Sequence, residues 1–203
     1  MLLEVPEGKK RILLHCCCAP CSGAVVECLV QNGLRPTLFF SNSNIVPREE
    51  YDLRRSELTR YARLFGLEVV DDEYDHEAWL DFTIGHDKAL EKVPERGPRC
   101  LRCFKFRLQR AAQYAAANGY DVLTTTLASS RWKSLEQVDE AGRLACENMQ
   151  VIWWNQNWRK GGLQPRRSEI IKEQQFYNQT FCGCEFSRPA GDVIPADCTC
   201  PAD

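Results

Sequence analysis

Long hydrophobic runs are missing from this chain of 203 residues. No stretch approaches the roughly 20 apolar residues that cross a bilayer. The opening segment, MLLEVPEGKKRILLH, has an apolar run too short for the core of a secretory signal, so we expect a cytoplasmic protein. An excess of positive charge is missing as well, because the net charge is −2. This excludes nucleic-acid binding driven by overall charge, but not a local basic face.

Familiar catalytic signatures are also absent. The sequence contains no GxGxxG, no phosphate-binding GxxxxGK loop and no HExxH pair. The SGGxDS-type loop, which ATP-using members of similar α/β folds carry after their first strand, is replaced by cysteines, and this disfavours an adenylating enzyme. The three histidines, His15, His76 and His86, are scattered along the chain.

Strand and helix patterns alternate along a chain that is 44% hydrophobic and 27% charged. Such alternation predicts an α/β fold, a parallel sheet covered by helices on both faces. We expect a single α/β domain over residues 1–187, ending in a C-terminal helical and loop extension, and then a loosely ordered tail over 188–203. The predicted strands cover 11–14, 36–40, 67–70, 122–127 and 151–154. The predicted helices cover 22–32, 47–65, 76–84, 100–118, 134–148 and 168–177.

Cysteine is the one residue type in marked excess, with 12 copies. Without a secretory signal, clustered thiols indicate metal ligation or thiol redox chemistry rather than a disulfide framework. The densest cluster, Cys16, Cys17, Cys18 and Cys21, directly follows the first predicted strand. In parallel sheets ligands bind at the carboxyl ends of strands, so this cluster should lie in such a crevice. We expect at least Cys16 to face the core and some of the others to ligate a soft metal.

Two further pairs are candidates for the same chemistry. Cys100 and Cys103 form a Cys-x-x-Cys pair at a predicted helix start, where the helix dipole should favour the thiolate. Together with the first cluster they could complete a tetrahedral zinc site or an iron–sulfur cluster. Cys182 and Cys184 flank a glycine, and either a strained, labile disulfide or two more metal ligands fits this spacing. Cys28 and Cys146 lie within predicted helices, as buried packing residues.

A basic segment interleaved with tryptophans occupies the second half of the chain. Such a segment could follow a phosphate backbone and stack on exposed bases, although tryptophans in the core and charges on solvated helices would give the same pattern. The candidates for holding an RNA loop are Arg131, Trp132, Lys133, Trp158, Arg159 and Lys160.

Taken together and in order, six motifs resemble the epoxyqueuosine reductases of the QueH type. They are LLHCCCAPC (13–21), SNIVPREEY (43–51), RCLRC (99–103), TTTL (124–127), NWRKGG (157–162) and FCGC (181–184).

The resemblance implies an oxidoreductase that removes the epoxide oxygen of epoxyqueuosine at the wobble position of the tRNA anticodon, without cobalamin. This is the last step of queuosine formation. It implies a fold similar to the adenine nucleotide α-hydrolase (HUP) domains, and an electron donor that the sequence does not identify. It also implies a [4Fe-4S] cluster on Cys17, Cys18, Cys100 and Cys103, and a redox-active disulfide between Cys182 and Cys184. A second iron is described for the family, for which Cys21 is the candidate ligand here.

Two other functions use the same features and stay open at this point. One is a zinc-bearing module that binds tRNA without redox chemistry. The other is a tRNA sulfurtransferase on the same scaffold.

Overall fold

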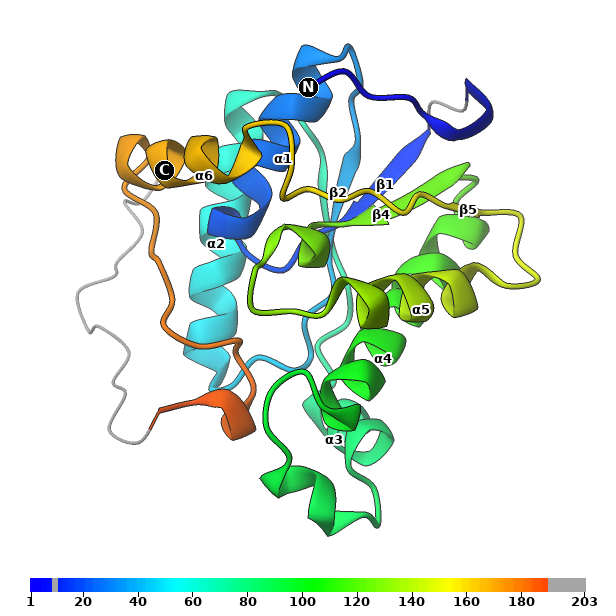
Figure 1. The fold of residues 1–203 in the computed structure, drawn as a ribbon, viewed down its shortest axis with the longest axis vertical. Helices are drawn as coiled ribbons and strands as arrows, with labels where there is room; N and C mark the ends of the chain where they lie inside the picture. Colours follow the sequence, from blue (N-terminus) through cyan, green and yellow to red (C-terminus); the bar gives the residue numbers. More distant parts are fainter. Residues whose placement is uncertain (9–10, 190–203) are drawn as a thin grey trace.

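The computed structural model describes residues 1–8 and 11–189, and its five strands form one parallel sheet (Figure 1). The strand order is β3-β2-β1-β4-β5. The strands are β1 (Ile12–His15), β2 (Thr37–Phe40), β3 (Val69–Asp71), β4 (Val122–Thr125) and β5 (Ile152–Trp153). The order reverses beside β1, so β1 and β4 flank the switch point where doubly wound sheets bind ligands.

Helices cover both faces of this sheet, as the sequence predicts. They are α1 (Ala19–Gln31), α2 (Arg48–Leu64), α3 (His76–Thr83), α4 (Pro98–Ala117), α5 (Leu135–Cys146) and α6 (Leu163–Glu173). Figure 1 shows α1, α2 and α6 on one side, and α4 and α5 on the other with α3 beneath them. Short 3-10 turns lie at Pro6–Gly8, Lys88–Lys92, Thr126–Ser129 and Glu185–Ser187. None of the helices in the described ranges is both long and apolar enough to cross a membrane.

The predicted boundaries are close for most elements and differ at two helices. α1 begins at Ala19, with Pro20 in its first turn, so Cys21 belongs to the helix rather than to the preceding loop. α6 begins at Leu163 and not near residue 168, because Gly162 (φ 82°) takes a left-handed conformation directly before it. The predicted tail, with Cys198 and Cys200, lies outside the described residues apart from positions 188 and 189.

The two halves of the sheet meet in a fixed register. Ile12 of β1 pairs with Val122 of β4, and His15 pairs with Thr125 at the carboxyl end. The side chains of β1 are fully buried, as continuous apolar runs in parallel strands require. The loops that follow the two strands, residues 16–18 and the 3-10 turn at Thr126–Ser129, therefore emerge side by side.

The opposite end of the core depends on close packing between α5 and β5. Gly142 faces the Trp153 ring, and a Cβ atom added at this glycine would lie 2.2 Å from ring atoms. Trp153 is held in place because its Nε1 donates to Asp139 Oδ1 at 2.8 Å. The ring therefore has little room to give way.

We expect Gly142→Ala to lower the free energy of unfolding by about 1–3 kcal/mol, the usual cost of overpacking. Urea denaturation of the metal-free protein would measure the change. Arg143→Ala, an alanine at the exposed neighbouring position, is the matched control and should stay within about 0.5 kcal/mol of the unsubstituted protein. Equal stability of Gly142→Ala and the unsubstituted protein would contradict this packing.

Candidate metal and redox site

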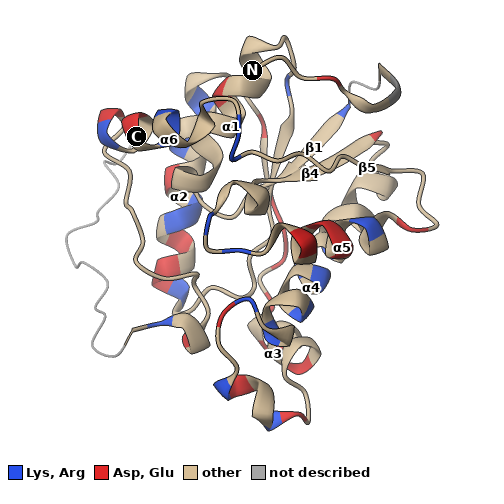
Figure 2. Ribbon diagram, in the orientation of Figure 1, with Lys and Arg blue, Asp and Glu red and all other residues tan. Residues whose placement is uncertain are grey.

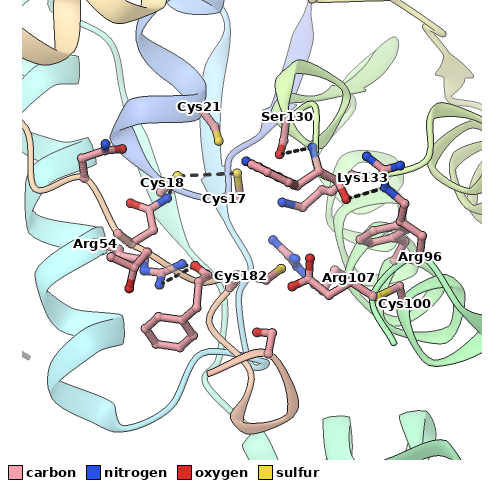
Figure 3. A pocket seen from close by; sticks show the side chains of 18 of the residues that line it. Cys17, Cys18, Cys21, Arg54, Arg96, Cys100, Arg107, Ser130, Lys133 and Cys182 are labelled. Carbon is pink, nitrogen blue, oxygen red and sulfur yellow. Dashed lines mark hydrogen bonds between the residues drawn. The ribbon is translucent and has the colours of Figure 1, made fainter. Parts of the chain in front are cut away.

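Three buried thiols meet at the carboxyl end of β1. The sulfur atoms of Cys17, Cys18 and Cys21 all lie within 4.8 Å of one another. Cys18 Sγ is 3.8 Å from Cys17 Sγ, the contact drawn in Figure 3. Cys16 points away, with its thiol 3.4 Å from the Leu14 carbonyl oxygen, and it is fully buried. The prediction that Cys16 packs in the core is therefore confirmed.

Side chains from the segments that follow β2 and β4 fix the backbone of the loop that carries these thiols. The Cys17 amide donates to Thr126 Oγ1 at 3.2 Å, and Asn42 Nδ2 donates to the Cys16 carbonyl at 2.9 Å. The Ser129 hydroxyl donates to the carbonyl of Cys21 at 2.9 Å. The loop is thus held from β2 on one side and from the turn after β4 on the other.

The three thiols share their protons unequally. Hydrogen bonds from the thiols of Cys18 and Cys21 hold the pKa of Cys17 well below its ordinary value. Those same bonds to Cys17 raise the pKa of Cys18 and of Cys21. Without a metal, Cys17 therefore ionises more readily than Cys18 and Cys21, whose two thiol protons bond to it. A soft cation that replaces the two protons would satisfy all three sulfurs, so the donor set suits a thiophilic metal or an iron–sulfur cluster.

Cysteines from two other segments line the same cavity. Its volume is about 420 Å³, and its walls include Cys17, Cys18, Cys21, Cys100 and Cys182. Figure 3 shows Cys182 and Cys100 across the cavity from the first three. Cys103 and Cys184 lie behind, around a small adjoining pocket that Cys100 and Cys182 also line. Three chain segments, each about 80 residues or more from the next in sequence, therefore line the same cavity.

The Cys-x-x-Cys pair lies in the first turns of α4, as predicted, but its thiols are not activated there. Burial raises the pKa of Cys100 to about 11 and also raises the pKa of Cys103. The expectation that the helix start favours thiolates is therefore wrong for the metal-free protein. The loss of solvation outweighs the helix dipole, and a bound metal would be needed to stabilise these thiolates.

The Cys-x-Cys pair is in the thiol form, since both Cys182 and Cys184 are free cysteines. Gly183 between them has φ 124°, and a Cβ there would lie 2.9 Å from Ile45 Cγ1. Burial raises the pKa of Cys184 to about 12, and its Sγ is 3.4 Å from Ser187 Oγ. Cys28 and Cys146 are buried in helices α1 and α5, which confirms their predicted packing role.

A buried ion pair on α2 fixes the position of Cys182. Arg54 Nε donates to Glu50 Oε1 at 2.6 Å, and both side chains are almost fully buried. The same guanidinium donates to the carbonyls of Phe181 (3.2 Å) and Cys182 (3.0 Å). Glu50 also accepts from the Tyr177 hydroxyl at 2.9 Å. Sequence reasoning missed the contact between Arg54 and Cys182, because nothing near Arg54 indicates a partner 128 residues away.

Other cations face the thiols. Arg107 lies one turn after Cys103 on α4, is buried, and donates to the Ser41 carbonyl at 3.2 Å and to Asn42 Oδ1. Burial lowers the pKa of Lys133, but electrostatic interaction with nearby cysteines, Cys182 first and then Cys17, outweighs this and leaves the pKa raised. Figure 3 shows Lys133 and Arg107 directed toward the cysteines. A positive environment of this kind offsets the charge of clustered thiolates.

His15 is neutral beneath the thiol loop. Burial, and then the charge of Arg107, lower its pKa to about 3. Its Nε2 donates to the Ser41 carbonyl at 3.1 Å, and Nδ1 lies 2.7 Å from Thr125 Oγ1. His15 therefore links the ends of β2 and β4, which fits a structural role.

The predicted RNA-holding residues fall into separate places. Trp132 is 76% exposed at the rim of the cavity, beside exposed Arg131. In Figure 2 the loop before α5, which carries Arg131 and Lys133, is basic, whereas both signs are mixed on α2 and α6. Lys160 is exposed. Arg159 donates to the carbonyls of Ser130 and Lys133 and so shapes this loop.

The prediction that Trp158 helps to hold an RNA loop is wrong. Trp158 is fully buried and packs edge-on against Trp154, with ring centroids 5.8 Å apart. Its ring belongs to the core and offers no face on which a base could stack.

A doubly wound α/β sheet with a thiol-lined cavity at its switch point defines a class of metal-dependent or thiol-dependent protein. Comparison with known proteins makes this specific. The family described as "QueH: Epoxyqueuosine reductase QueH" matches residues 12–190. The chain belongs to this family and is an oxidoreductase.

Several relatives carry the name epoxyqueuosine reductase QueH. The chain is 45% identical over 186 residues to the protein of Histophilus somni, covering 91% of this chain and 75% of the relative. It is 44% identical to the protein of Haemophilus influenzae, covering 91% and 74%. With the protein of Thermotoga maritima it shares 34% over 179 residues, covering 87% and 89%.

We expect Arg54→Met to lower the free energy of unfolding by about 3–5 kcal/mol, because Glu50 would be left as an uncompensated buried charge. Urea denaturation of the metal-free protein measures the effect. Arg55→Met on the same helix is the control. Arg55 pairs with Asp71 at the surface, where ion pairs contribute about 0–1 kcal/mol. Similar costs for the two variants would refute the anchoring role of Arg54.

Proposed function

We propose that this chain reduces epoxyqueuosine in tRNA to queuosine and uses a metal centre held by the cysteines of the cavity. The observation that carries the proposal is the cavity itself, since thiols from residues 17–21, 100 and 182 line one space at the switch point of the sheet. Because tRNA is the substrate, we place the reaction in the cytoplasm.

Cys17, Cys18, Cys100 and Cys103 are the proposed ligands of a [4Fe-4S] cluster, which would supply electrons singly at low potential. Their chemistry fits this role, because all four are thiols and the cations Arg107 and Lys133 lie nearby; Cys17, Cys18 and Cys103 are buried, and Cys100 is half-buried. Cys21 belongs to the tight group with Cys17 and Cys18. It is therefore the proposed ligand of a second iron ion.

The cysteine pair at 182 and 184 balances the reaction. Removing the epoxide oxygen breaks two C–O bonds, forms one C=C bond and releases water. This reaction consumes two electrons and two protons. Oxidation of the Cys182 and Cys184 thiols to a disulfide releases two electrons and two protons. An external electron donor then reduces the disulfide for the next turnover.

The rim of the cavity is the proposed entrance for the anticodon loop. An exposed tryptophan beside basic residues is a surface on which single-stranded RNA stacks, and Trp132 with Arg131 provides it. Lys133, directed inward, would lie closer to the reacting ring, and Lys160 remains a candidate phosphate contact. Arg159 supports this surface by fixing the loop carbonyls.

The ligand assignment predicts that Cys100→Ser loses iron. After anaerobic reconstitution we expect the variant to bind much less iron and sulfide. It should also lose the broad absorption band at about 400 nm. Cys146→Ser is the matched control, because Cys146 is also a helical cysteine but does not line the cavity. Full iron content in Cys100→Ser would show that Cys100 is not a ligand.

Anaerobic conversion of epoxyqueuosine-containing RNA, followed by mass spectrometry as the loss of one oxygen, tests the function directly. We expect the unsubstituted protein to convert it and Cys182→Ser to keep its iron but lose sustained turnover. The metal content of the variant serves as its control. Normal turnover of Cys182→Ser with the physiological donor would refute the redox role of this pair.

A further inference from the structure

Two adjacent arginines on α6 have opposite surroundings. Arg166 binds three carboxylates: Glu27 of α1 at 2.6 and 2.9 Å, Glu169 at 3.1 Å, and Glu173 at 2.9 and 3.1 Å. It is fully paired and ties α6 to α1. Arg167 instead lines the thiol cavity. Its Nε atom is buried and has no hydrogen-bond partner, and no carboxylate pairs with it among the residues that the structure describes.

The other arginines of the cavity are all committed to protein groups. Arg54 holds Glu50 and two carbonyls, and Arg107 holds Ser41 and Asn42. Arg96 donates to the carbonyls of Arg131 and Trp132, which fixes the rim loop. Arg167 is therefore the guanidinium of this cavity that is left to bind something else. A buried donor without a partner is costly, and a ligand that supplies acceptors removes the cost.

The chemistry of a guanidinium selects an anion with several oxygens. Arg binds phosphate groups well because its planar fork of donors matches their oxygen atoms. The nearby thiols are an unsuitable partner, since those of the proposed ligand set are used by the metal. Across the cavity the exposed ring of Trp132 offers a stacking face. Phosphate on one side and a stacked base on the other are the two features of a nucleic-acid strand.

We propose that Arg167 binds a backbone phosphate of the substrate RNA, beside the nucleotide that enters the cavity. This rests on the proposed function, because it takes the anticodon loop as the occupant. Since α6 lies in the helix layer of α1 and α2 whereas Trp132 precedes α5, the RNA strand would be held from both layers of the fold (Figure 1).

Binding of an unmodified anticodon stem-loop RNA, measured by fluorescence anisotropy at several salt concentrations, tests this assignment. We expect Arg167→Gln to weaken binding about tenfold, the value of one charge-assisted contact. The slope of log affinity against log salt should fall by about 0.7, as for one lost phosphate contact in a single strand. Arg167→Lys, which keeps the charge, should restore most of the slope.

Lys172→Gln is the matched control, because it removes one positive charge from the exposed end of the same helix. It should bind RNA like the unsubstituted protein. The thermal stability of Arg167→Gln should also be unchanged, since Arg167 has no partner within the described ranges to lose. In turnover assays Arg167→Gln should raise KM and leave kcat nearly unchanged.

Affinity and salt slope of Arg167→Gln equal to those of the unsubstituted protein would overturn the proposal. An equal loss in Lys172→Gln would overturn it too, because the effect would then reflect overall charge. The binding assay uses RNA without the epoxide and needs no metal centre. Failure of the protein to reduce epoxyqueuosine would therefore count against the proposed function and leave the Arg167 result standing.

Discussion

Three buried thiols packed within 4.8 Å of one another are the constraint on which the site depends. Such a group cannot carry three negative charges without a cation, and hydrogen bonds from the other two thiols lower the pKa of Cys17. Arg107 and Lys133 lie nearby, but hydrogen bonding to Cys17 and burial raise the pKa of Cys18 and of Cys21. The arrangement is therefore poised for a metal, and the parallel register of β1 and β4 holds it at the place where doubly wound sheets bind ligands.

Most of the fold could be predicted from the sequence, because buried parallel strands and capped helices produce recognisable local sequence patterns. Ser134 illustrates this: a serine three residues before a glutamine is typical of a capping box, and its hydroxyl accepts from the Gln137 amide at 3.3 Å. The other half of the box is absent, since the Gln137 side chain donates to the carbonyls of Arg96 and Gly97 instead. A tertiary contact across 40 residues competed with the local one, and local sequence carries no sign of it.

The site was readable in part. Clustered cysteines are rare enough in sequences to be recognised as candidate functional residues. The structure places five of them around one cavity: Cys17, Cys18, Cys21, Cys100 and Cys182. The position of Trp158 could not be predicted, because the sequence of a basic segment does not show whether its tryptophans are buried or exposed. In the structure Trp158 is buried. Arg107, four residues after Cys103, could have been found from helical spacing. Two contacts could not be found, because their partners are distant in sequence: that of Arg54 with the Cys182 carbonyl, and that of Gln179, whose Nε2 donates to Cys18 Sγ at 2.8 Å.

The wall that Asn178, Gln179, Thr180 and Phe181 contribute to the cavity has a consequence for how the protein matures. During synthesis the polypeptide leaves the ribosome with the earlier cysteines first, and this wall follows more than 70 residues after Cys103. Until it docks on α2, the thiols of the nascent chain face solvent on that side. A product truncated before this segment would leave the cavity open on that side and expose its sulfurs to oxidants.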